Sequence, residues 1–122
     1  MLTSLFRAIC DHLTPLGVPV YLADCVPDGA AFPYITANIA APLAAHTAGA
    51  VTLTLWCAGD QANAQRLSQV DELLALLPAR GIPLTTAAGV ITLRQTGGAQ
   101  CLRESGALGM KTVWKLCCFP AQ

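Results

Sequence analysis

The sequence predicts an α+β fold, a mostly antiparallel sheet of about four to five strands with two α-helices packed on one face. Two segments, residues 2–13 and 67–77, carry apolar residues at helical spacing. Segments of alternating apolar and polar residues lie between and after them. The 122 residues suffice for one hydrophobic core without metals or disulfides, so residues 1–122 are expected to form a single domain.

The first helix is expected over residues 2–13. Its apolar stripe consists of Leu2, Leu5, Phe6, Ile9 and Leu13. Thr3 or Ser4 is expected to cap its start. Thr14-Pro15 and Gly17 should end it, because a proline disfavours the helical conformation in the residue before it.

Two strands and a turn are expected next. Residues 18–23 are rich in β-formers, but Pro19 has no N–H for a ladder, which indicates an edge strand or a strand start. Val26–Gly29, "VPDG", is typical of a turn. Tyr34–Ile39 then alternates between two faces.

Phe32, Pro33 and Tyr34 are predicted to anchor the start of that strand. Pro33 restricts its own φ, and the two rings are expected to hold the chain in the core where the loop becomes a strand.

The segment Ala40–Gly49 is rich in small residues and is expected to be a long loop. Ordering a residue costs about 1–2 kcal/mol of backbone entropy. We therefore expect the loop to be mobile in the lone protein and ordered against a partner. The residues expected to make that contact are Pro42, Leu43, His46 and Thr47.

Ala50–Ala58 is the clearest strand. Val51, Leu53, Leu55 and Cys57 should face the helices, with Thr52, Thr54 and Trp56 on the other side. Asp60 can cap a second helix, which Pro78 and Gly81 would close. The stripe of this helix consists of Leu67, Val70, Leu74 and Leu77.

The last third returns to strands. A short strand is expected at Leu84–Thr86, another at Gly89–Gln95, and a long one at Gly106–Phe119 after the Gly97-Gly98 break. One face of the long strand should hold Met110, Thr112, Trp114, Leu116 and Cys118.

Charge is scarce. Charged residues make up 11% of the chain, against about 25% in a typical soluble domain. Part of the surface is therefore expected to be buried against other subunits, the alternative being a monomer with an uncharged polar surface. The net charge is zero and the seven basic residues are scattered, which disfavours nucleic-acid binding.

No segment is typical of a membrane protein. No apolar run reaches the roughly 18 residues of a membrane-spanning helix, and the N-terminus lacks the pattern of a signal peptide. No membrane partner is expected, and the protein is expected in the cytosol.

The six cysteines are expected to be free thiols without a metal. The chain has no CxxC pair, and neither His12 nor His46 is spaced from a cysteine as metal ligands are.

Catalytic motifs are absent from the sequence. Gly106–Thr112, "GALGMKT", lacks the adjoining Gly-Lys of a phosphate loop. Asp71 and Glu72 are neighbours and would point apart on a helix, as would Cys10 and His12 at positions i and i+2. The sequence therefore predicts a non-enzyme with no catalytic residues, no cofactor and no metal.

The two tryptophans allow two interpretations. Trp56 and Trp114 could stack on a ligand, or both could lie in strands of one sheet and pack against a helix or a neighbour. The second interpretation is favoured, because aromatic residues are common in cores and interfaces.

The chain resembles the tail terminator or tail completion (minor tail) proteins of long-tailed bacteriophages. The similar features are the N-terminal helix, "VPDGAAFPYIT", "VTLTLWCAGDQANAQRLSQVDELLALL", and the closing "GVITLRQTGG" and "KTVWKL". The resemblance implies a structural virion protein of a phage or prophage, assembled in the bacterial cytoplasm. It implies a hexameric ring that caps the tail tube, with the tail tube protein and head–tail connector proteins as partners. The alternative is a small α+β ligand-binding or regulatory domain without catalytic activity.

Overall fold

The structure is a computed structural model, and it describes most of the chain. The described residues are 2–40, 48–58, 68, 71–72, 75–76, 82–86, 89–97, 99–104 and 106–120. Within them, no helix has both the length and the apolar character to cross a membrane.

The N-terminal helix α1 spans Leu2–Leu13, as predicted. Leu5, Ile9 and Leu13 are buried in the core. A short 3₁₀ turn, η1 (Thr14–Leu16), follows. Gly17 then takes a left-handed backbone conformation (φ 71°) that residues with a Cβ rarely adopt. Its N–H donates to the carbonyl of Thr14 at 3.0 Å. The predicted caps Thr3 and Ser4 lie inside the helix, so that detail was wrong.

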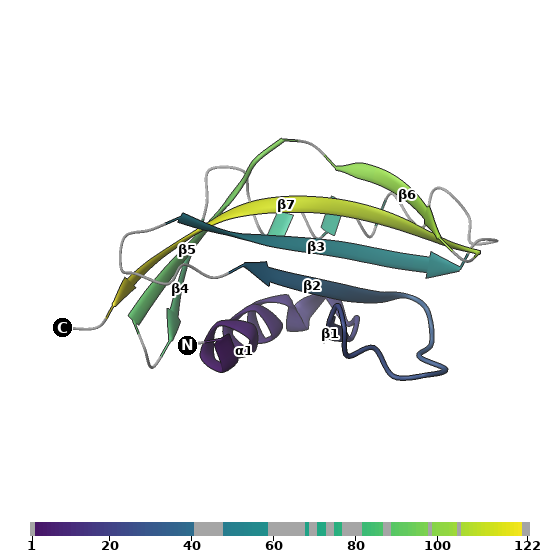
Figure 1. Ribbon diagram of the computed structural model, residues 1–122, viewed down its shortest axis with the longest axis horizontal. Helices are drawn as coiled ribbons and strands as arrows, with labels where there is room; N and C mark the ends of the chain where they lie inside the picture. The colour runs from purple at the N-terminus through teal and green to yellow at the C-terminus, as the bar shows by residue number, and fades with distance from the viewer. Residues whose placement is uncertain are drawn as a thin grey trace.

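Seven strands form one sheet (Figure 1). The strands are β1 (Val20–Leu22), β2 (Tyr34–Ala40), β3 (Ala48–Ala58), β4 (Ile82–Thr86), β5 (Gly89–Gln95), β6 (Gln100–Glu104) and β7 (Ala107–Pro120). Their order is β1-β2-β3-β7-β5-β4, and β6 also pairs with β7. β1 runs parallel to β2, and the other pairings between described strands are antiparallel.

The predicted fold class was therefore wrong. The sheet is larger than expected and mixed, and α1 is the one α-helix whose bounds the described residues define, so two helices on one face are not what the structure has. The expected second helix lies outside the described residues apart from a few helical positions: Ser68, Asp71, Glu72, Ala75 and Leu76.

The long strand β7 organises the sheet. β3 pairs with it from Ala58↔Ala107 to Ala48↔Cys117. On its other side, β5 and β6 pair with successive parts of β7 (Figure 1). Between β5 and β6, the N–H of Thr96 donates to the carbonyl of Val113 at 2.9 Å, so the chain stays attached to β7 across the break.

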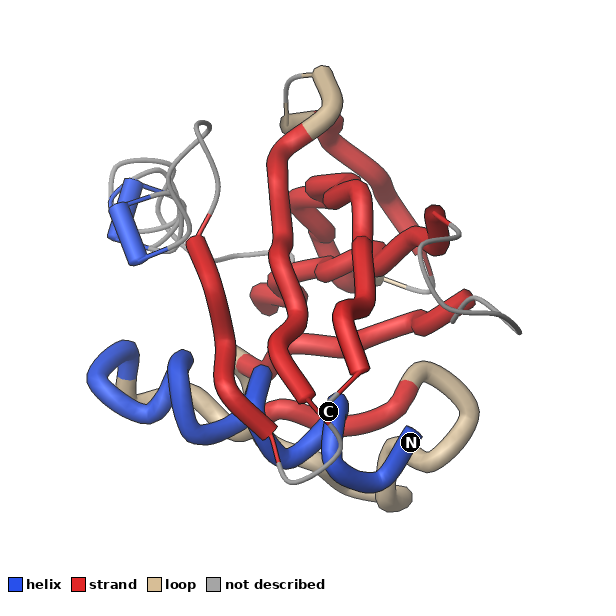
Figure 2. The backbone as a smooth tube through the Cα atoms, turned by 90° about the vertical axis from the view of Figure 1, so that its left-hand side faces the viewer, coloured by secondary structure: helices blue, strands red, loops and turns tan. Residues whose placement is uncertain are grey.

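One face of the sheet forms the core with α1, which runs along the β2 side of the sheet (Figure 2). The predicted inward residues of β3 are all buried: Val51, Leu53, Leu55 and Cys57. Trp114 and Leu116 of β7 and Ile35 and Ala37 of β2 complete this layer. The predicted faces of β3 and β7 are confirmed where the side chains are described.

The structure differs from two predictions about loops. β2 continues to Ala40 and β3 starts at Ala48, so both ends of the expected loop belong to the sheet. Its contact residues Pro42, Leu43, His46 and Thr47 lie outside the described residues. The turn expected at Val26–Gly29 is shifted by one residue, since the N–H of Ala30 donates to the carbonyl of Pro27 at 3.2 Å.

Candidate functional site

Aromatic side chains gather on the face of the sheet opposite the core. We call Tyr21, Phe32, Tyr34 and Trp56 the aromatic surface. The rings of Phe32 and Tyr34 stack with centroids 5.3 Å apart and planes 14° apart. Tyr21 meets Tyr34 edge-on at 5.8 Å. Phe32 remains 43% exposed, so the prediction that its ring anchors the chain in the core was wrong.

Strand register brings these rings together. Tyr21 lies beside Thr36 in the parallel β1–β2 pair, and Tyr34 lies opposite Trp56 in the antiparallel β2–β3 pair. The indole N–H of Trp56 donates to the hydroxyl of Thr36 at 3.0 Å. The Phe32-Pro33 peptide bond is cis, and it lies directly before β2.

Gly109 of β7 makes room for the indole of Trp56. A Cβ at this position would lie 2.9 Å from Cζ3 of Trp56, closer than real Cβ atoms approach, and 3.0 Å from Cγ2 of Thr54, which is also tight. The absence of a side chain lets Trp56 lie against the strand.

A hollow of about 400 Å³ adjoins the aromatic surface. Phe32, Tyr34 and Trp56 line it together with Glu104 of β6. Among the described residues of this lining, Glu104 is the one charged side chain. The aromatic surface therefore borders a hollow whose lining mixes aromatic rings with polar groups, among them the carboxylate of Glu104.

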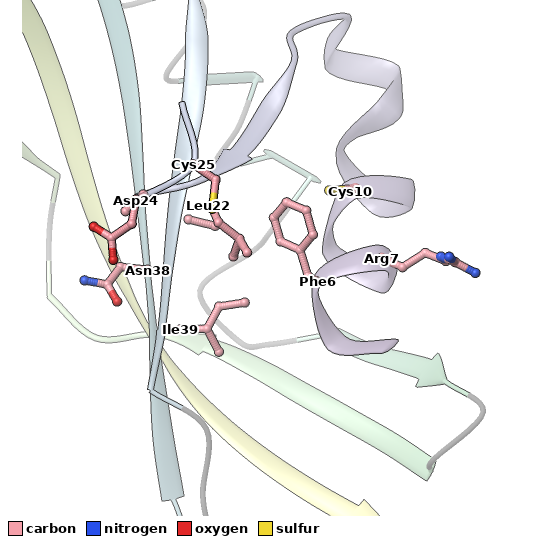
Figure 3. Close-up of a pocket in the computed structure, with 10 residues that line it drawn as sticks. Phe6, Arg7, Cys10, Leu22, Asp24, Cys25, Asn38 and Ile39 are labelled. Carbon is pink, nitrogen blue, oxygen red and sulfur yellow. The ribbon is translucent and has the colours of Figure 1, made fainter. Parts of the chain in front are cut away.

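A second apolar site lies on the other side of β1 and β2, between these strands and α1. We call it the helix groove; its volume is about 670 Å³. Its apolar lining consists of Phe6, Leu22, Ala23, Ala37 and Ile39, with the thiols of Cys10 and Cys25. Figure 3 shows Phe6 of α1 facing Leu22 of β1 across the groove, while Arg7 points away from it.

The groove is poorly suited to nucleophilic chemistry. Burial raises the pKa of the Cys10 thiol, and the negative charge of Asp11 raises it further. The protonated thiol is a weak nucleophile. Nε2 of His12 lies 2.6 Å from the carbonyl oxygen of Leu76, so this ring is engaged with a backbone group elsewhere.

The tryptophans do not form a ligand-stacking pair. Trp114 is fully buried on the core face, where its indole N–H donates to the Thr112 hydroxyl at 2.9 Å. Trp56 lies on the opposite face. The interpretation favoured from the sequence was that both lie in strands of one sheet and pack against a helix or a neighbour. Both do lie in strands of the sheet, and Trp114 packs in the core.

Metal ligands do not cluster in the part of the chain that the structure describes: no group of three or more His, Cys, Asp and Glu side chains could hold an ion there. The thiols of Cys10, Cys25, Cys101 and Cys117 are free.

Sequence reasoning found Phe32 and Tyr34 but missed the helix groove. Its lining comes from α1, β1 and β2, and no local pattern links these segments. A weak signal was available in Leu22, a large apolar residue in a segment that Pro19 marks as an edge strand.

Comparison with known proteins supports the fold and gives no information on function. No family model and no curated protein matches the chain. A solved structure without a descriptive name is similar to it, with a TM-score of 0.63 and 12% sequence identity. The match covers 98% of this chain and 94% of the other. At this identity the likeness supports the architecture over nearly the full length, and no activity follows from it.

Proposed function

We propose that the protein is a structural subunit of a phage or prophage tail, a tail terminator or tail completion protein. In this proposal, copies of the chain form a hexameric ring that caps the tail tube and helps to join the tail to the head. Its partners are then further copies of itself, the tail tube protein and head–tail connector proteins. The proposal starts from the resemblance of "VPDGAAFPYIT" and the following strand to that family.

One structural observation carries the proposal. Large apolar side chains are exposed on both faces of the β1–β2 pair, Leu22 at 39% and Phe32 at 43%, in a chain with 11% charged residues. Leu22 lines the helix groove together with further apolar side chains, and Phe32 stacks on Tyr34. Contiguous apolar patches on a soluble protein are typical of interaction sites, and an assembly subunit needs such sites.

The groups that could have suggested catalysis are engaged otherwise. Burial and the charge of Asp11 raise the pKa of the Cys10 thiol, and Nε2 of His12 lies 2.6 Å from the carbonyl oxygen of Leu76. We therefore propose a non-enzymatic role.

A ligand-binding domain is the second candidate, and the helix groove favours it. The groove volume of about 670 Å³ lies within the roughly 300–1,000 Å³ of small-molecule sites. Its lining would suit a compact apolar ligand. A thermal-shift screen of apolar compounds tests this candidate: stabilisation that is lost in Leu22→Glu would support it.

Removing the gene from the phage or prophage that encodes it tests the leading candidate. We expect heads and tails to accumulate unjoined in electron micrographs, and expression of the wild-type chain to restore complete particles. Normal numbers of complete particles without the gene would contradict the proposal.

A further inference from the structure

We propose that the hollow beside the aromatic surface binds a quaternary ammonium group, held against the rings of Phe32 and Trp56 with Glu104 as the counter-charge. The trimethylammonium end of a small organic cation is such a group. The inference goes beyond the proposed tail function and does not rest on it. The site is also separate from the helix groove, which lies on the other face of the strands.

Two rings of the hollow keep a face that no other ring covers. Phe32 stacks on Tyr34 with one face, the planes lying 14° apart, and the side chain remains 43% exposed. The indole of Trp56 lies against Gly109 and also lines the hollow. Cations bind over the faces of aromatic rings within about 6 Å of the ring centre, and tryptophan is the strongest partner.

The rings are held in place without a ligand. Tyr34 stacks on Phe32 at 5.3 Å and meets Tyr21 edge-on at 5.8 Å. Trp56 lies opposite Tyr34 in the β2–β3 register, and its indole N–H donates to the Thr36 hydroxyl at 3.0 Å. Rings that are already fixed lose little conformational entropy when a ligand binds.

Strand register places a carboxylate beside these rings. Glu104 pairs with Ala107 in β6–β7, and Ala107 pairs with Ala58 in β7–β3, two residues after Trp56. Directly opposed residues of antiparallel strands point to the same face, so Glu104 and Trp56 share one. Glu104 is exposed and forms no ion pair in the part of the chain that the structure describes. Its negative charge is therefore available to a bound cation.

Two further charges lie on this face of the sheet. Figure 3 shows Asp24 on the side of the strands away from Phe6. Lys111 pairs with Thr54, two residues before Trp56 on β3. Neither belongs to the described lining of the hollow. With the carboxylate of the lining, two negative charges stand against one positive charge, which favours a cation over an anion.

The lining also favours one kind of cation. A metal ion needs several ligand atoms, and no cluster of three or more His, Cys, Asp and Glu side chains could hold one among the described residues. A primary ammonium has three N–H donors to satisfy, and the Thr36 hydroxyl of the lining already accepts the indole N–H of Trp56. A quaternary ammonium has no N–H donor, and aromatic sites recognise it through their ring faces.

The size of the hollow suits a small molecule. Its volume of about 400 Å³ lies within the roughly 300–1,000 Å³ of small-molecule sites. The hollow therefore has room for the ammonium group together with the short chain that carries it.

An NMR titration of the purified chain with choline tests the proposal. The two indole N–H signals report on opposite faces of the sheet, because Trp114 is fully buried in the core. Choline should shift the Trp56 signal, with a dissociation constant in the millimolar range, and leave the Trp114 signal in place. Sodium chloride at the same concentrations is the control for ionic strength. A Trp56 signal that does not move, or that sodium chloride moves equally, would overturn the proposal.

The uncharged isostere of choline separates cation binding from apolar binding. In this molecule a tert-butyl group replaces the trimethylammonium group, so the shape is kept and the charge is lost. The isostere should bind at least several-fold more weakly, since the ring faces and Glu104 attract the charged molecule alone. Equal binding of the two molecules would overturn the proposal, and this comparison needs no variant.

Two carboxylate variants form a matched pair. Glu104→Gln removes one negative charge from the lining, whereas Asp24→Asn removes the same charge from the same face outside it. Both side chains are exposed, so both variants should fold, which circular dichroism can verify. Choline should bind several-fold more weakly to Glu104→Gln and almost unchanged to Asp24→Asn. Equal losses would contradict the site, because the charge would then act only through the general field of the face.

Phe32→Leu tests the aromatic ring, because leucine keeps an apolar side chain and has no π-face. Choline binding should weaken several-fold, while the weaker binding of the isostere should stay as it is in the wild type. Unchanged choline binding in Phe32→Leu would overturn the role of the ring and with it the proposal.

Co-sedimentation with phosphatidylcholine vesicles identifies the source of the group. Sedimentation of the wild-type chain but not of Phe32→Leu would assign the site to a lipid head group. Choline binding without sedimentation would assign it to a soluble molecule, and both results support the site. Normal phage particles after gene deletion would overturn the tail function and leave this site standing, so the two proposals fail separately.

Discussion

At the scale of single residues, the core holds a buried polar pair at the centre of the sheet. Thr112 and Trp114 are fully buried and lie two residues apart on one face of β7. The Thr112 hydroxyl accepts a hydrogen bond from the Trp114 indole at 2.9 Å and donates one to the carbonyl of Leu53 at 3.2 Å. The largest buried side chain therefore depends on one hydroxyl for its hydrogen bond.

Thr112→Val should lower the free energy of unfolding by about 1–3 kcal/mol, because it leaves the buried indole N–H without its acceptor at nearly constant volume. Urea unfolding followed by tryptophan fluorescence measures the change. The control is Thr96→Val. The exposed hydroxyl of Thr96 donates to the carbonyl of Val113 at 3.3 Å, and its removal should lower the free energy of unfolding by less than about 0.5 kcal/mol. Equal effects would contradict this account of Thr112.

The cysteines offer a second test at this scale. Burial, and then Asp11, raise the pKa of Cys10, so less thiolate forms there at mildly alkaline pH. Iodoacetamide should therefore modify Cys10 more slowly than the exposed Cys25, as peptide mass spectrometry can measure. The difference should disappear in denaturing urea, where burial is lost. Equal rates in the folded protein would contradict the assignment.

At the scale of elements, the sequence allowed the faces of strands to be predicted better than their partners. Alternation in β3 and β7 identified the buried side chains, because side chains of a strand alternate between faces. β6 was missed because Gln100–Glu104 is mostly exposed and shows no apolar alternation. The parallel β1–β2 pairing was missed because register between strands depends on the whole sheet, which local patterns do not encode.

Neighbouring positions of β3 test the assignment of faces. Leu53→Asp should abolish cooperative unfolding, since it buries an unpaired charge in a fully buried position. Thr52→Asp, one residue earlier and on the opposite face, should leave a cooperative transition. Thermal unfolding followed by circular dichroism would measure both. Cooperative unfolding of Leu53→Asp at an unchanged temperature would show that the face is wrong.

At the scale of the whole molecule, the strand-start residues have a role other than the one predicted. Phe32 and Tyr34 were expected in the core, but the register of β2 with β3 places them beside Trp56 on the outer face. The sequence identified these residues but could not place them, because the face on which Tyr34 falls follows from strand pairing. The helix groove, built from three separate segments, was not predictable for the same reason.

The hexameric ring of the proposed function belongs to this scale, and the low share of charged residues, 11%, favours burial of part of the surface between subunits. A ring forms when each copy makes the same contact with the next and the rotation closes. Assembly through apolar surfaces should resist moderate salt, because salt screens exposed charge pairs and leaves apolar burial intact.

Native mass spectrometry of the purified wild-type chain over a range of concentrations would detect such a ring. We expect a closed oligomer as the main species, a hexamer of the 12.7 kDa chain, in low and moderate salt alike. A spectrum that contains the 12.7 kDa monomer alone at every concentration would contradict it.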